Sequence, residues 1–175
     1  MAKVGILGAG SWGIALSVLL HNNGHDITVW SALADEIDML RREHEHKDKL
    51  PGVKLAEDVL FTTELSDAVR EKDILVLAVP SSFTRATAHN MREYVADGQI
   101  IVNVAKGIEE STLMTLSQVI EQEMPQADVA VLSGPSHAEE VGKCIPTTIV
   151  VGAGTKKTAE YIQSVFMNEV FRVYI

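Results

Sequence analysis

The sequence predicts an α/β fold in which a doubly wound, mainly parallel sheet is flanked by helices on both faces. Short β-branched runs bounded by turn residues alternate with longer helical patterns, as in repeated βαβ units. The run 74–79 is apolar at every position, which is typical of a strand covered on both faces. A glycine-rich turn follows the first strand candidate directly and opens a helix. These three observations predict one α/β domain.

The elements follow in order along the chain. Strands are expected at 3–7, 26–30, 59–62, 74–79, 100–104, 129–132, 147–151 and 171–174. Helices are expected between them at 12–22, 34–45, 64–70, 83–95, 113–123, 137–141 and 157–166. The polar stretch 44–52 ends in Pro51-Gly52 and is expected to be a surface connection.

Length and charge narrow the class of protein further. The chain has 175 residues, about one domain, and a formal net charge of −9, which argues against sequence-independent nucleic-acid binding. No apolar run approaches the roughly 18 to 20 residues of a membrane span, and no secretory signal opens the chain, so a cytoplasmic protein is expected. The single cysteine, Cys144, is expected to pack in apolar surroundings. The spacing of the six histidines predicts no metal site.

The first strand is followed by the motif G-x-G-x-x-G at residues 8–13. Gly8 permits a tight turn, Gly10 lets the backbone approach a pyrophosphate, and Gly13 lets the helix pack closely on the strand. Free N–H groups and the positive end of the helix then face the phosphates. The sequence therefore predicts a Rossmann-type dinucleotide site that needs no basic patch.

The residues after the second strand leave the choice between NAD and NADP open. An acidic residue there usually holds the ribose 2′-hydroxyl, and an arginine accommodates the 2′-phosphate of NADP. Here the strand continues into residues 31–33, Ser-Ala-Leu. Asp35 and Glu36 come slightly later and are expected in the first turn of the next helix, where acids complement the dipole.

Ligands of doubly wound sheets collect at the carboxyl ends of the strands, where three further segments stand out. Phe83 follows the fourth strand and either covers a nicotinamide or ribose or packs in the core. Lys106 follows the fifth and is either a ligand-binding ammonium or a solvated charge. After the sixth come Gly134 and a fresh helix start, a second place for an anion, where Ser136 and Glu139 have the spacing of a capping box.

Several motifs together resemble the NAD(P)-dependent glycerol-3-phosphate dehydrogenases over essentially the whole chain, which corresponds to the first half of that family's proteins. They are the glycine turn 8–13, Leu-Pro-Gly-Val at 50–53, Val-Pro-Ser at 79–81, Lys-Gly at 106–107 and Ser-Gly-Pro-Ser at 133–136. Residues 1–175 are then a dinucleotide-binding domain. The chain stops on an apolar run, and the family's helical substrate domain, with its proton-transferring lysine, is expected beyond Ile175.

The resemblance implies a reversible hydride transfer between NAD or NADP and the pair dihydroxyacetone phosphate and sn-glycerol 3-phosphate, which feeds glycerophospholipid synthesis. It assigns cofactor contacts to the glycine turn with Ser11 and Trp12, and to Phe83, Lys106 and Ala138. Gly134, Ser136 and Lys106 would contact the substrate. Family members often carry an arginine where Ala32 stands, and a homodimer is left open.

Two other interpretations fit the glycine turn. One is the cofactor domain of a different two-domain dehydrogenase, acting on a hydroxy acid or a hydroxyacyl substrate. The other is a stand-alone NAD(P)-binding sensor without chemistry of its own. The first does not require the motif at 133–136, and the second is favoured only if the natural gene stops at Ile175.

Overall fold

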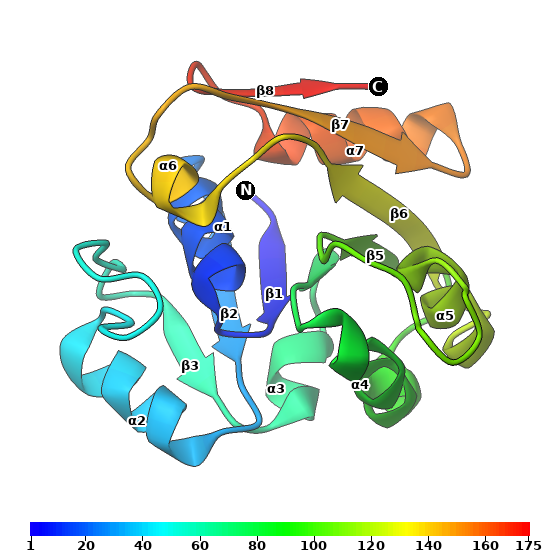
Figure 1. Ribbon diagram of the computed structural model, residues 1–175, viewed down its shortest axis with the longest axis horizontal. Helices are drawn as coiled ribbons and strands as arrows, with labels where there is room; N and C mark the ends of the chain where they lie inside the picture. Colours follow the sequence, from blue (N-terminus) through cyan, green and yellow to red (C-terminus); the bar gives the residue numbers. More distant parts are fainter.

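The computed structural model describes all residues 1–175 and confirms the predicted α/β architecture (Figure 1). The strands are β1 (Lys3–Leu7), β2 (Asp26–Trp30), β3 (Leu60–Thr62), β4 (Ile74–Leu77), β5 (Ile100–Asn103), β6 (Asp128–Ser133), β7 (Thr147–Ala153) and β8 (Phe171–Tyr174). The helices are α1 (Ser11–Asn22), α2 (Ala34–Glu43), α3 (Leu65–Val69), α4 (Thr84–Met91), α5 (Leu116–Glu123), α6 (Ala138–Gly142) and α7 (Lys156–Phe166). No helix is long and apolar enough to cross a membrane.

The strands form one sheet in the order β3-β2-β1-β4-β5-β6-β7-β8. All neighbouring pairs are parallel except β6 and β7. The chain runs outward from β1 to β3, then returns to place β4 on the other side of β1. The order therefore reverses between β1 and β4, which is where open α/β sheets bind ligands, at the carboxyl ends of the strands.

Each face of the sheet is covered by its own set of helices. On one face α1, α2, α6 and α7 pack over a core of 34 buried residues, and on the other α3, α4 and α5 pack over a second core of 14. Strand β4 contributes to both, because Ile74 and Val76 face the first core and Leu75 and Leu77 the second. Successive side chains of a strand point to opposite faces, so a strand buried on both sides must be apolar throughout, as predicted.

Several predicted boundaries are wrong. The expected helix 83–95 is a 3₁₀ turn (Ser81–Phe83), α4 and a second 3₁₀ turn (Arg92–Tyr94). Helix α2 ends at Glu43 because His44 adopts a left-handed conformation, with φ of 49°. Helix α5 begins at Leu116, where the Thr115 side chain and Gln118 form a capping box that the sequence analysis missed. Cys144 is exposed, so the predicted packing role is wrong.

Candidate dinucleotide-binding site

A pocket of about 660 Å³ lies at the reversal point of the sheet. Its walls come from the segments that follow β1, β2, β4 and β5, together with the start of α6. The parallel register aligns Leu7 with Trp30 and with Leu77, so the carboxyl ends of these strands lie side by side. The volume is within the usual range of roughly 300 to 1,000 Å³ for small-molecule sites.

The β1–α1 turn presents backbone N–H groups to this pocket. Gly10 is the N-cap of α1 and supplies no side chain, so the N–H groups of the first turn meet no capping side chain. The first turn also contains no acidic residue. Helix α1 is twelve residues long and its start has no side-chain cap. Such a helix start attracts an anion through its free backbone N–H groups and through the positive end of the helix dipole.

The three glycines of the turn have different structural roles. Gly8 has a φ of +122°, which side-chain-bearing residues rarely adopt. A Cβ on Gly13 would lie 2.0 Å from the Gly8 carbonyl oxygen, so the helix can sit this close to the strand only without one. A Cβ on Gly10 would meet nothing within 4 Å, which leaves open space where the motif places the pyrophosphate.

Two aromatic residues predicted to contact the cofactor both line the pocket. The Trp12 indole donates a hydrogen bond of 3.1 Å to the Val104 carbonyl, which fixes the ring between the ends of β1 and β5. Phe83 has 60% of its surface exposed, so the alternative of a core residue is wrong. Its ring is free to cover a bound molecule.

Lys106 is not simply a solvated charge. Its ammonium Nζ donates a hydrogen bond of 2.7 Å to the carbonyl oxygen of Gly134, which follows β6. Lys106, Ser136 and Ala138 all line the pocket, whereas Gly134 does not and is joined to it through the hydrogen bond from Lys106. The structure thus brings together residues whose sequence positions are about 30 apart, as the motifs at 106–107 and 133–136 predict.

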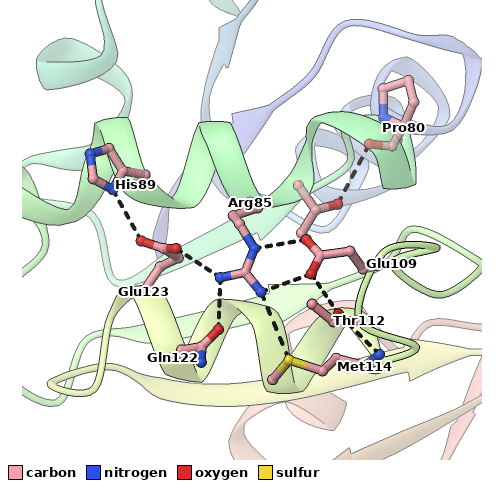
Figure 2. A network of polar contacts seen from close by, with 9 residues as sticks. Pro80, Arg85, His89, Glu109, Thr112, Met114, Gln122 and Glu123 are labelled. Atoms are coloured by element: carbon pink, nitrogen blue, oxygen red, sulfur yellow. Dashed lines mark hydrogen bonds and ion pairs between the residues drawn. The ribbon is translucent and has the colours of Figure 1, made fainter.

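The loop that carries Lys106 is held by a network of ion pairs on the surface (Figure 2). Arg85 of α4 contacts both carboxylate oxygens of Glu109, with Nε–Oε2 and Nη2–Oε1 distances of 2.7 and 2.8 Å. Its Nη1 also contacts Glu123 of α5 at 2.8 Å. The hydrogen bond from Arg85, followed by that from Thr112, lowers the pKa of Glu109 to about 2. An ion pair of this geometry restrains the loop three residues beyond Lys106.

The β6–α6 turn differs from the prediction. The N-cap of α6 is His137, its side chain makes no capping hydrogen bond, and the Ser136 hydroxyl contacts Gly134 instead, so the predicted capping box is wrong. Helix α6 has only five residues and carries Glu139 and Glu140 in its first turn. Both properties weaken attraction to an anion, so the second predicted anion site is not supported as a helix start.

The end of β2 contains a polar cluster that the sequence analysis missed. Glu36 lies in the first turn of α2, as predicted, but it is also buried, and it accepts hydrogen bonds from Ser31, His46 and Lys49. Glu36 and Lys49 both line the pocket. The contacts of Glu36 with His46 and Lys49 depend on how the connection 44–52 folds back over α2. No local sequence spacing predicts that path.

The chain is similar to known proteins over nearly its whole length. A protein-family model described as "NAD-dependent glycerol-3-phosphate dehydrogenase N-terminus" matches residues 3–159. A glycerol-3-phosphate dehydrogenase [NAD(P)+] from Agathobacter rectalis is 63% identical over 174 residues, which are 99% of this chain and 52% of that protein. The enzyme of the same name from Bacillus subtilis is 42% identical and is covered to 51%.

A solved structure agrees with these sequence relatives. The crystal structure of glycerol-3-phosphate dehydrogenase from Coxiella burnetii superposes with a TM-score of 0.93 at 27% identity, over 99% of this chain and 53% of that one. The chain therefore spans about half the length of the relatives that it matches.

Proposed function

The chain belongs to the family of NAD-dependent glycerol-3-phosphate dehydrogenase N-terminal domains, and on that premise we propose that it binds NAD(H) or NADP(H) for the interconversion of dihydroxyacetone phosphate and sn-glycerol 3-phosphate. The observation that carries this proposal is the β1–α1 turn, an uncapped and acid-free helix start over open space at Gly10. The names of the relatives state the same dependence on NAD(P)+. The family match favours this reaction over that of another two-domain dehydrogenase.

The residues of the pocket fit a dinucleotide. The first-turn N–H groups of α1 would hold the pyrophosphate, and Ser11, Trp12, Phe83 and Ala138 would line the rest of the cofactor. The nicotinamide, when bound, supplies or accepts the hydride. The contribution of the chain is to fix that ring beside the substrate and to exclude water from one side.

Lys106 is the group that we propose for the substrate. Its ammonium is held at Gly134, and it would place positive charge beside the phosphate or the carbonyl oxygen of dihydroxyacetone phosphate. Ser136 and Gly134 would complete this end of the site. The proton-transferring lysine that the resemblance implies is not assigned to any of these 175 residues, so this domain would bind and orient.

The wider setting is part of the same proposal. The reaction would supply sn-glycerol 3-phosphate to glycerophospholipid synthesis in the cytoplasm. The partner is a small phosphorylated molecule rather than a nucleic acid, and a homodimer stays open. The net charge of −9 agrees with a ligand held by local geometry.

The test is calorimetric titration of the chain with NADH and with NADPH. Gly10→Val places a branched side chain where the pyrophosphate would lie. We expect binding to weaken roughly a hundred-fold, because two charge-assisted hydrogen bonds are each worth about 1.5 kcal/mol or more. Equal affinity in a folded Gly10→Val variant contradicts the proposal.

Gly154→Val is the matched control. Gly154 also has open space around it. It follows β7, whose antiparallel pairing with β6 places Ala153 beside Ala130, near the amino end of β6 and away from the pocket. This variant should bind both cofactors like the parent.

A further inference from the structure

Lys106 lies on a short segment that is held on both sides. Before it, the side-chain amide of Asn103, which is 4% exposed at the end of β5, donates a hydrogen bond of 3.1 Å to the Ala105 carbonyl. After it, Gly107 has a φ of +113°, and a Cβ there would lie 3.4 Å from the Ser81 side chain. The segment therefore turns sharply at Gly107 and lies against the 3₁₀ turn that follows β4.

The loop 108–115, which comes next, closes on itself. Its two ends pair in an isolated antiparallel bridge between Ile108 and Thr115. Inside that bridge the Glu109 backbone N–H donates a hydrogen bond of 2.9 Å to the Met114 carbonyl. The loop is therefore a compact unit, and a contact that holds one part of it restrains the rest.

Arg85 of α4 holds this loop from outside (Figure 2). Its guanidinium makes the bidentate contact with Glu109 and lies 3.8 Å from the Met114 sulfur. It also donates to Gln122 and Glu123 of α5 at 2.7 and 2.8 Å. One planar group thus joins α4, the loop and α5. A lysine in its place would keep the charge but lose the bidentate contact.

The ion pair between Arg85 and Glu109 also joins two walls of the pocket. Arg85 lies two residues after Phe83, whose exposed ring lines the pocket. Glu109 lies three residues after Lys106, which lines the pocket as well. Neither Arg85 nor Glu109 is among the lining residues, so the contact that holds the two walls together is made outside the pocket.

We propose that Arg85 is a positioning residue for the hydride transfer, and that through Glu109 it holds Lys106 where the ammonium group meets the substrate. This inference rests on the proposed function and adds to it a residue that touches neither cofactor nor substrate. Cofactor binding depends much less on Arg85, because the pyrophosphate has its own donors in the first turn of α1. Loss of Arg85 therefore affects the substrate far more than the dinucleotide.

The test compares substrate kinetics with cofactor affinity in the same variants. In a protein of the relatives' full length, Arg85→Met should lower kcat/KM for dihydroxyacetone phosphate roughly ten- to a hundred-fold, as small misplacements of a reacting group do. The dissociation constant of the 175-residue chain for NADH should stay nearly unchanged. Arg85→Lys keeps the charge without the bidentate contact and should restore only part of the lost activity.

Glu109→Gln tests the route of the effect. It breaks the same ion pair from the other side, so it should also lower kcat/KM and spare NADH affinity. The double variant Arg85→Met with Glu109→Gln should be little worse than Arg85→Met alone, because the two substitutions remove one shared contact. Fully additive losses would mean that Arg85 does not act through Glu109, which overturns the inference.

Arg92→Met is the matched control. Arg92 is an exposed arginine of the 3₁₀ turn after α4 and takes no part in the ion pairs of Arg85, so its loss should change neither quantity. Unchanged kcat/KM in Arg85→Met, or in Glu109→Gln where the arginine variant does not fold, overturns the inference and leaves the proposed function intact. An equal fall in NADH affinity and in kcat/KM also overturns it. A parent that neither binds NADH nor reduces dihydroxyacetone phosphate refutes the proposed function itself.

Discussion

Two turns in this protein share a sequence form and differ in what they offer a ligand. Both the β1–α1 and the β6–α6 turns lead from a parallel strand through a glycine into a helix that reaches the pocket. The first opens a twelve-residue helix without acids in its first turn, and its backbone donors are free. The second opens a five-residue helix with two glutamates, and its Gly134 carbonyl is an acceptor that binds the Lys106 ammonium.

The difference shows that a strand, a glycine and a helix start do not by themselves define an anion site. Helix length, capping and the charge of the first turn decide whether the turn binds an anion directly. In the first turn the backbone supplies the positive potential. In the second it supplies an acceptor, and the positive charge must come from a lysine on another strand end.

The largest expected effect is on stability, because the glycines of the two turns are packed to different degrees. Gly13→Ala would bring a Cβ to 2.0 Å from the Gly8 carbonyl oxygen, and neither backbone segment can move cheaply. We expect a loss of about 4 kcal/mol or more in the free energy of unfolding, at the upper end for single substitutions. Gly134→Ala, whose Cβ would lie 3.0 Å from the Thr148 carbonyl oxygen, should cost only about 1 to 2 kcal/mol. Urea unfolding followed by circular dichroism measures both, and equal losses would mean that the two turns are packed alike.

The second effect tests whether substrate binding at the β6–α6 turn depends on Lys106, which follows β5. In a protein of the relatives' full length, Lys106→Ala should lower kcat/KM for dihydroxyacetone phosphate. The loss should correspond to about 2 to 4 kcal/mol of transition-state stabilisation. The free energy of unfolding should barely change, because Lys106 is exposed. Lys156→Ala, which removes an exposed lysine of α7, is the control. Near-normal kinetics in the Lys106 variant would return this residue to the role of a solvated charge.

The smallest effect concerns the network that restrains the Lys106 loop. Because the pKa of Glu109 falls from 4.5 to about 2 in the folded chain, its carboxylate stabilises the fold fully above pH 4.5, and this contribution is lost as the pH falls toward 2. Glu109→Gln should therefore flatten the decrease of the unfolding free energy over that range. Glu110→Gln, next along the chain and in none of the ion pairs, should not. Identical pH profiles for the parent and Glu109→Gln would show that the pair contributes nothing to stability.

The parts of the fold that the sequence predicts are those with a local signature. The apolar run at β4 predicts a strand buried on both faces, and the glycine spacing predicts the tight turn at Gly8 and the close packing at Gly13; these predictions are confirmed. The capping boxes show the limit of such signatures. Ser136 and Glu139 have the spacing without the hydrogen bonds, whereas Thr115 and Gln118 have the hydrogen bonds. Because α6 begins at Ala138, its N-cap position is held by His137 and not by Ser136.

The candidate site is predictable to the same degree. Residues placed by strand ends, such as Trp12, Phe83 and Lys106, are found in the pocket because a parallel sheet aligns all its carboxyl ends. Lys49 is different, since it reaches Glu36 through thirteen residues of helix and irregular connection. Arg85 and Glu109 are likewise joined across 24 residues. Such contacts depend on the tertiary path of the loops, which carries no periodic signal.

The two tryptophans give the pocket an optical property. The sequence contains only Trp12 and Trp30, and both line this one cavity, each anchored by its indole N–H to a backbone carbonyl, of Val104 and of Thr63. All indole emission of the chain therefore originates at the walls of the crevice. A reduced nicotinamide absorbs in the range where indole emits, so a bound dinucleotide would quench that emission by energy transfer. Occupancy of the crevice can thus be followed in the unlabelled protein, without a background signal from indoles elsewhere.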